Sequence, residues 1–158
     1  MTAALTAADI FRAAVLLEER GARFYGEAAS RFRGEEGKLF AGLASMELNH
    51  AERFRSILKD TGPEEELDRE KVQYLEALTG GRIFTAETEW DEGDGCEEIL
   101  QKAIAVEKNA VFFYTAVKET LLAGMDAEAV DRLIREEVSH FEFLSAALLK
   151  RRRGGGGE

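Results

Sequence analysis

Two short motifs occur twice in this chain, in the same order and at nearly the same spacing. The first motif places a glutamate seven residues before a tyrosine, and the second is a Glu-x-x-His sequence. In chain order the residues are Glu18 and Tyr25, Glu47 and His50, Glu107 and Tyr114, and Glu137 and His140. The two glutamates of each repeat are 29 residues apart in the first half and 30 apart in the second. This spacing indicates two similar helical hairpins.

The repeated residues lie on the apolar stripes of four helical segments. Stripe residues recur at alternating steps of three and four, which is the spacing of a helix face turned toward a core. The stripes are Phe11, Ala14, Glu18, Gly21, Tyr25, Ala28 and Phe32; Phe40, Leu43, Glu47, His50, Phe54 and Ile57; Leu100, Ala103, Glu107, Ala110, Tyr114, Val117 and Leu121; and Val130, Leu133, Glu137, His140, Leu144 and Ala147. The acidic neighbours Glu19, Glu36, Glu52, Glu98 and Glu136 lie outside them. We therefore do not count these neighbours among the candidate ligands.

Four buried carboxylates without partners would cost several kcal/mol each, which is more than the net stability of a domain can absorb. Two divalent cations between the hairpins would balance their charge. The expected metal ligands are Glu18, Glu47, His50, Glu107, Glu137 and His140. Residues at i and i+3 share a helix face, so the glutamate of each Glu-x-x-His can bridge both ions while its histidine binds one. Oxygen-rich ligation with one imidazole per ion suits iron or manganese, and zinc would also bind.

Two other interpretations of the ligand pattern remain open. The Glu-x-x-His pairs could coincide by chance, or the chain could be a metal-free descendant of a metal-binding bundle. Tyr25 and Tyr114 also have two interpretations. Each lies two turns from its own glutamate, about 10 Å by helix rise, and could instead donate a hydrogen bond to a carboxylate on a neighbouring helix or act as a redox-active phenol. The alternative is an ordinary core tyrosine with a satisfied hydroxyl.

The expected fold is all-α: a four-helix bundle with one long crossover that contains a short extra helix. The predicted long helices cover residues 6–33, 35–59, from 94 or 97 to before Gly124, and 126–152. Thr6 and Asp9 form a capping box at the start of the first predicted helix, and Gly34 is expected to end that helix. Thr61-Gly62-Pro63 ends the second helix, residues 64–79 form the short amphipathic helix, and residues 80–95 form a loop. One long crossover between two antiparallel hairpins is the ferritin-like connectivity.

We expect one domain over residues 1–153 and a disordered tail at 154–158. The formal charge of −10 argues against binding to nucleic acid or anionic membranes. A single cysteine, Cys96, excludes an internal disulfide and a Cys-x-x-Cys metal site, and we expect it to be an ordinary thiol in a loop. No signal peptide and no apolar run near 18 residues is recognisable, so a cytoplasmic location is expected.

The four-part motif and the sequence LEERGARFY resemble the ferritin-like di-iron superfamily, and rubrerythrin-type domains in particular, over about residues 6–150. The resemblance implies a non-haem di-iron centre that reacts with hydrogen peroxide or dioxygen, with the six residues above as iron ligands. An oxidoreductase is therefore the expected function, with Tyr25 and Tyr114 as candidate catalytic residues. The competing expectation is a bundle that oxidises and stores Fe(II).

Three departures from related families qualify this resemblance. Rubrerythrins often carry an extra glutamate one turn after the third-helix ligand, tied to their peroxidase cycle, but this chain has Ala110 there. It also lacks the paired Cys-x-x-Cys motifs of a rubredoxin domain, so an external electron donor, rubredoxin-like or a flavoprotein, is expected. Bacterioferritins bind haem through a methionine that this chain replaces with Leu48, so no haem is expected. We also expect a homodimer.

Overall fold

The computed structural model describes residues 5–60, 67–78, 90–121 and 125–154, and all regular structure within them is helical. The helices are α1 (Ala7–Arg31), α2 (Gly34–Lys59), α3 (Arg69–Leu78), α4 (Cys96–Leu121) and α5 (Met125–Gly154). The expected all-α fold is confirmed, and the expected short helix in the crossover is α3. The predicted stop at Thr61-Gly62-Pro63 and most of the predicted loop at 80–95 lie outside the described residues.

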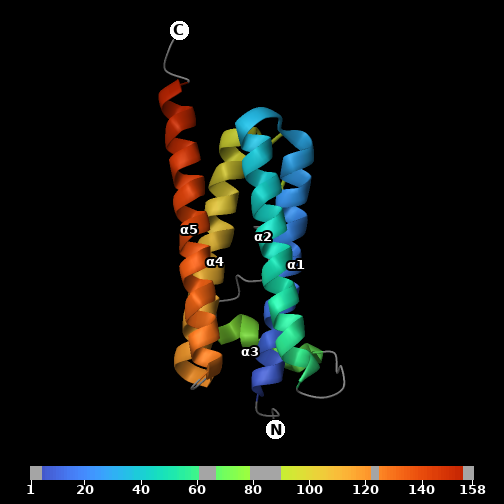
Figure 1. The fold of residues 1–158 in the computed structure, drawn as a ribbon. Helices are drawn as coiled ribbons and strands as arrows, with labels where there is room; N and C mark the ends of the chain where they lie inside the picture. The colour runs from blue at the N-terminus through green and yellow to red at the C-terminus, as the bar shows by residue number, and fades with distance from the viewer. Residues whose placement is uncertain (1–4, 61–66, 79–89, 122–124, 155–158) are drawn as a thin grey trace.

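Four long helices lie side by side in two antiparallel hairpins, α1 with α2 and α4 with α5 (Figure 1). In Figure 1, α1 and α5 run upward while α2 and α4 run downward, and the short α3 crosses the lower end of the bundle. Helix α1 contacts α4, and α2 contacts α5, so the two hairpins face each other. This arrangement is the expected bundle with one long crossover.

The first hairpin begins and turns through specific local contacts. The Thr6 side chain accepts a hydrogen bond from Asp9 N–H, and the Asp9 side chain accepts one from Thr6 N–H at 2.9 Å, which confirms the capping box. Lys71 of α3 binds the same Asp9 carboxylate at 3.0 Å and so ties α3 to α1. Helix α1 ends at Arg31, earlier than expected, because Phe32 is extended with φ −106° and ψ 144°. Gly34, the predicted stop, instead begins α2 with φ +76°, a left-handed conformation that glycine adopts without strain.

Two apolar clusters fill the bundle, one toward each end. The first includes Phe11, Phe54, Leu75, Phe113 and Val117, and Leu75 of α3 is fully buried in it. The second includes Phe24, Phe40, Leu43, Cys96, Leu100 and Leu144. The prediction that Cys96 lies in a loop was wrong, because it is the first residue of α4 and only 5% exposed. Burial raises the pKa of its thiol.

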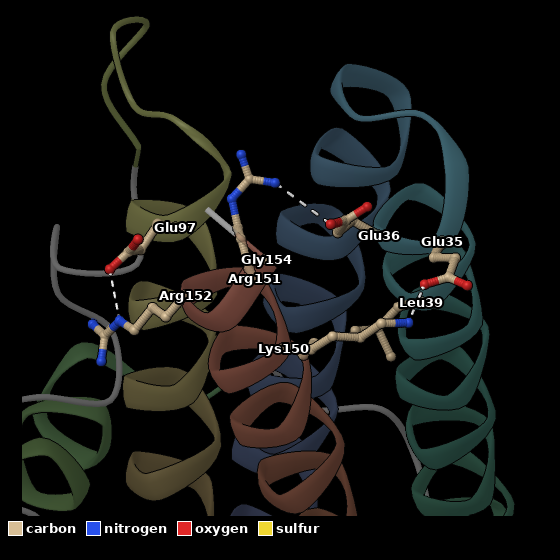
Figure 2. Close-up of a pocket in the computed structure, with 9 residues that line it drawn as sticks. Glu35, Glu36, Leu39, Glu97, Lys150, Arg151, Arg152 and Gly154 are labelled. Carbon is tan, nitrogen blue, oxygen red and sulfur yellow. Dashed lines mark hydrogen bonds and ion pairs between the residues drawn. The ribbon is translucent and has the colours of Figure 1, made fainter. Parts of the chain in front are cut away.

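The C-terminal end of α5 is tied to both hairpins by surface ion pairs. Lys150 binds Glu35 at 2.8 Å, and Arg152 binds Glu97 at 2.8 Å (Figure 2). Arg151 also lies 3.5 Å from Glu36 on α2. These side chains border an open groove of about 830 Å³, which lies at the bundle end and contains none of the predicted ligands. Gly154 belongs to α5, while residues 155–158 of the predicted tail lie outside the described residues.

Candidate metal centre

The structure brings all six predicted ligand residues together between the two apolar clusters. They form two groups in which the potential ligand atoms lie within 4.8 Å of one another. The groups are Glu18, Glu47, His50 and Glu137, and Glu47, Glu107, Glu137 and His140. Each group therefore contains one histidine, and Glu47 and Glu137 belong to both. Every one of the six residues is at most 4% exposed.

The helix stripes explain this placement. Each residue lies one or two turns from apolar stripe residues that are themselves buried, such as Leu43 before Glu47 and Leu133 before Glu137. Gly21 makes room for Glu47 where α1 and α2 approach, because a Cβ at this position would lie 3.3 Å from Glu47 Oε2. The expected inward register is thus observed in all four long helices.

His50 directs Nδ1 at carboxylates from three helices. This nitrogen lies 2.8 Å from Glu137 Oε1, 3.2 Å from Glu18 Oε2 and 4.0 Å from Glu47 Oε2. The other ring nitrogen, Nε2, lies 2.6 Å from Glu136 Oε2. The sequence had given no role to Glu136 because it lies beside the stripe. Its position next to Glu137 and its acidity were the only signals available.

His140 directs its Nδ1 at the second group in a similar way. This nitrogen lies 3.1 Å from Glu47 Oε1, 3.3 Å from Glu137 Oε2 and 3.7 Å from Glu107 Oε2. The imidazole rings of His50 and His140 are nearly parallel, with centroids 5.6 Å apart and an angle of 13° between the planes. Nδ1 is therefore the nitrogen that both histidines offer to the middle of the site.

Both motif tyrosines donate hydrogen bonds across the bundle, each to a glutamate of the other hairpin. The Tyr25 hydroxyl donates to Glu107 Oε1, and the Tyr114 hydroxyl donates to Glu18 Oε1. Neither contacts the glutamate of its own motif, as the helix rise had indicated. Burial raises the pKa of both phenols well above 10, and the charge of the carboxylate that each one binds raises it further. Each tyrosine therefore stays a hydrogen-bond donor at neutral pH.

Burial and mutual repulsion change the proton affinity of the carboxyls. Burial raises the pKa of Glu47 well above its usual range, and the nearby charges of Glu137 and Glu18 raise it further. Burial also raises the pKa of Glu107 to about 8, although His140 acts in the opposite direction. For Glu137, burial is outweighed by hydrogen bonds from the two histidines, and its pKa falls to about 2.

The pKa values of the two histidines are raised by the carboxylates that surround them. Burial alone would lower their pKa values, but the adjoining carboxylates raise the pKa of His50 to about 10 and that of His140 to about 9. Without metal, therefore, Glu107, His50 and His140 each hold a proton at neutral pH, and the pKa of Glu47 is shifted in the same direction. Divalent cations could take the place of these protons in balancing the carboxylate charge.

The donor set fits two divalent cations. It offers four carboxylates and two imidazoles in an apolar interior, where unbalanced charges are costly. One buried donor atom, His140 Nε2, has no hydrogen-bond partner within the described part of the chain. The two oxygens of Glu137 face different histidines: Oε1 lies 2.8 Å from His50 Nδ1, and Oε2 lies 3.3 Å from His140 Nδ1.

A cavity of about 370 Å³ adjoins the His50 side of the site. It lies between α2 and α5 and is lined by His50, Arg53, Phe54, Ile57, Ala129, Arg132, Leu133 and Glu136. It therefore connects the outer face of His50 with the protein surface.

Among the described helices, none is long and apolar enough to cross a membrane.

Comparisons with known proteins agree with this geometry. A crystal structure from Thermotoga maritima, reported as a ferritin-like diiron-carboxylate protein, is similar with a TM-score of 0.69 and 25% identity, covering 96% of this chain and 99% of that one. No curated protein matches the chain. The rubrerythrin family model matches residues 9–89, just over half of the sequence. With its ferritin-like fold and its carboxylate–histidine metal site, the chain belongs to the rubrerythrin family.

Proposed function

We propose that this protein is a non-haem di-iron oxidoreductase that reduces hydrogen peroxide or dioxygen at the buried centre. The observation that carries the proposal is the pair of overlapping groups, in which Glu47 and Glu137 are shared and each group has its own histidine. Such an arrangement suits two ions held close together by bridging carboxylates. Membership of the rubrerythrin family supports iron over manganese or zinc.

The residues divide into shared and separate ligands. Glu47 and Glu137 would hold both ions, and Glu18 and Glu107 would each hold one. His50 and His140 would bind through Nδ1. When bound, two ferrous ions would together supply two electrons, which with two protons reduce hydrogen peroxide to two waters.

The surrounding protein would control access to the site. Tyr25 and Tyr114 hold the terminal carboxylates in place through their hydroxyl groups. The two apolar clusters exclude bulk water from both ends of the site. An oxidant as small as peroxide could enter through the cavity beside His50.

Stopped-flow absorption tests the proposal. Protein loaded anaerobically with Fe(II) is mixed with hydrogen peroxide or with dioxygen, and the growth of ferric absorbance is followed. We expect one or both oxidants to react much faster than with free Fe(II), and Glu137→Ala to lose this acceleration. Rates equal to those of free Fe(II) for both oxidants would contradict the proposal. Repeated turnover with reduced rubredoxin or a reduced flavoprotein would test the proposed external electron donor.

A second candidate function is an iron-storage bundle that oxidises and sequesters Fe(II). It is favoured by Ala110, which is buried where many rubrerythrins carry an additional glutamate. Storage requires a hollow assembly of many subunits, whereas we propose a homodimer. Gel filtration separates the two, because a monomer or dimer favours the oxidoreductase and a shell of roughly 24 subunits favours storage.

A further inference from the structure

The two histidines differ on the side that faces away from the carboxylate groups. Nε2 of His50 lies 2.6 Å from Glu136 Oε2. Nε2 of His140 is buried and has no hydrogen-bond partner among the residues that the structure describes. The two imidazole rings are nearly parallel, and both offer Nδ1 to the site, so the difference lies in their outer surroundings.

The repeat shows where this difference comes from. Glu136 is the residue immediately before the shared ligand Glu137, and the residue immediately before Glu47 is Met46. Both side chains are partly exposed, at 36% for Glu136 and 38% for Met46. A thioether is only a weak hydrogen-bond acceptor and carries no charge. The first hairpin therefore lacks at Met46 the carboxylate that the second hairpin supplies.

Glu136 is itself held from outside. Arg53 donates to Glu136 Oε1 at 2.9 Å and to Oε2 at 3.1 Å. The resulting chain of contacts runs from Arg53 on α2 to Glu136 on α5 and back to His50 on α2. An exposed ion pair of this kind contributes little stability by itself. Its short contact with a histidine that is 2% exposed links it to the metal centre.

We propose that Glu136 is a positioning residue that makes the His50 half of the metal centre bind its ion more tightly than the His140 half. A carboxylate that accepts Nε2–H of a histidine fixes the tautomer with a free Nδ1, orients the ring and increases its basicity as a ligand. His50 has this support and His140 does not. The inference rests on the metal centre proposed above.

The test is a titration of metal-free protein with Co(II), followed by calorimetry and visible absorption. We expect the wild type to bind about two ions in two steps, the first tighter than the second. Glu136→Leu should weaken the tighter step by about 10–100-fold. Glu136→Gln keeps an acceptor oxygen without the charge. Its affinity for Co(II) in the tighter step should lie between those of the wild type and Glu136→Leu. Glu142→Leu, an exposed glutamate on the same helix, is the matched control and should match the wild type.

Two single-half backgrounds show which half responds. Glu107→Ala removes a ligand from the His140 half, so only the His50 half should bind Co(II) tightly. Glu136→Leu should weaken binding in that background and change the Co(II) absorption spectrum. In the Glu18→Ala background, where the His140 half remains, Glu136→Leu should change neither the Co(II) affinity nor the Co(II) absorption spectrum. The reverse design, Met46→Glu, should tighten the weaker step of the full site.

The possible failures are distinct. Unchanged binding in Glu136→Leu, or equal weakening in both single-half backgrounds, would overturn the positioning role of Glu136. An unchanged weaker step in Met46→Glu would count against the importance of an outer carboxylate. If the wild type bound no Co(II), the metal centre itself would be refuted, together with this inference. Circular dichroism of each metal-free variant confirms that it is folded.

Discussion

The two hairpins supply matching residues to the inside of the site and different residues to its outside. On the His50 side, the residues facing the cavity include Arg53, Arg132 and Glu136. At the corresponding positions of the other half, the sequence has Phe143, Gly42 and Met46. The His50 side is therefore charged and hydrogen-bonded, whereas the corresponding positions of the other half carry no charged side chain, and Phe143 is 55% exposed.

A second difference lies one turn after the terminal ligands. Gly21 follows Glu18 on α1 and leaves space for the Glu47 carboxylate, while Ala110 follows Glu107 on α4. The comparison shows that the repeat retains the six candidate metal ligands, because all six side chains must point at the same small volume. The residues that touch those ligands from outside are under weaker geometric demands and differ between the halves.

The largest effect is expected from substituting a ligand that both halves share, because both halves should then lose their metal ion. Because Glu47 and Glu137 belong to both groups, Glu47→Ala or Glu137→Ala should lower the metal content from about two ions per chain to nearly none. Glu18→Ala and Glu107→Ala should each retain about one ion. Elemental analysis after Fe(II) loading and gel filtration provides the measurement. Two ions in either shared-ligand variant would rule out bridging.

Metal removal should have the next largest effect. Binding to the native state alone stabilises by about 4 kcal/mol when free metal is a thousandfold above the dissociation constant. For a chain of this size, that corresponds to a rise of roughly 10 °C in the melting midpoint. Thermal melts with metal and after chelation and dialysis should show this gap. With one equivalent of metal, the midpoint should lie between them; identical midpoints would favour a metal-free bundle.

The pH dependence of stability should have opposite signs with and without metal. In the metal-free fold, the pKa values of Glu107, His140 and His50 are raised to about 8, 9 and 10. Between about pH 5 and 9 the folded chain therefore holds protons that the unfolded chain has lost, and its stability should fall as pH rises. Metal displaces these protons, so the loaded protein should instead lose stability as pH falls.

Melting midpoints across this pH range, measured on both forms, check the sign. Calorimetry in buffers of different ionisation enthalpy should also show the release of protons as two ions bind at pH 7, because Glu107, His50 and His140 are protonated without metal. Parallel pH profiles for the two forms would show that metal does not bind at these groups.

The tyrosine variants should have smaller effects that separate the halves. Tyr25→Phe removes the hydrogen bond to Glu107, in the His140 half, and Tyr114→Phe removes the one to Glu18, in the His50 half. Leaving a buried carboxylate oxygen without its partner costs about 1–3 kcal/mol. Each variant should therefore weaken one Co(II) step by about tenfold or more. Tyr74→Phe, at an exposed tyrosine, is the control. Equal weakening of both steps would contradict this pairing.

The smallest expected effect concerns the ion pairs at the end of α5. Lys150 and Arg151 bind Glu35 and Glu36 at the surface, where solvent screens such pairs (Figure 2). Lys150→Ala and Arg151→Ala should leave both Co(II) steps unchanged and lower the melting midpoint only slightly. The small difference should disappear at high salt. A change in either metal step would show that the bundle end influences the centre.

Sequence periodicity was sufficient for the fold and for the inner residues of the site. The spacing of apolar residues along one helix fixes which face turns inward, so a glutamate or histidine on that face must be buried wherever the helix packs. The length of the segment between Glu47 and Glu107 likewise required a crossover between two hairpins. These predictions depend on one helix or one connection at a time.

The tertiary structure alone decided the contacts between helices. Glu136 lies at the edge of its stripe, and only the distance between α2 and α5 determines whether it reaches His50 or solvent. The choice of Nδ1 as the inward nitrogen, and the exchange of tyrosine partners between hairpins, depend in the same way on how the helices are placed. Cys96 is buried because the start of α4 packs on Phe24 and its neighbours. Such contacts join residues far apart in the chain, and no periodicity within one helix encodes them.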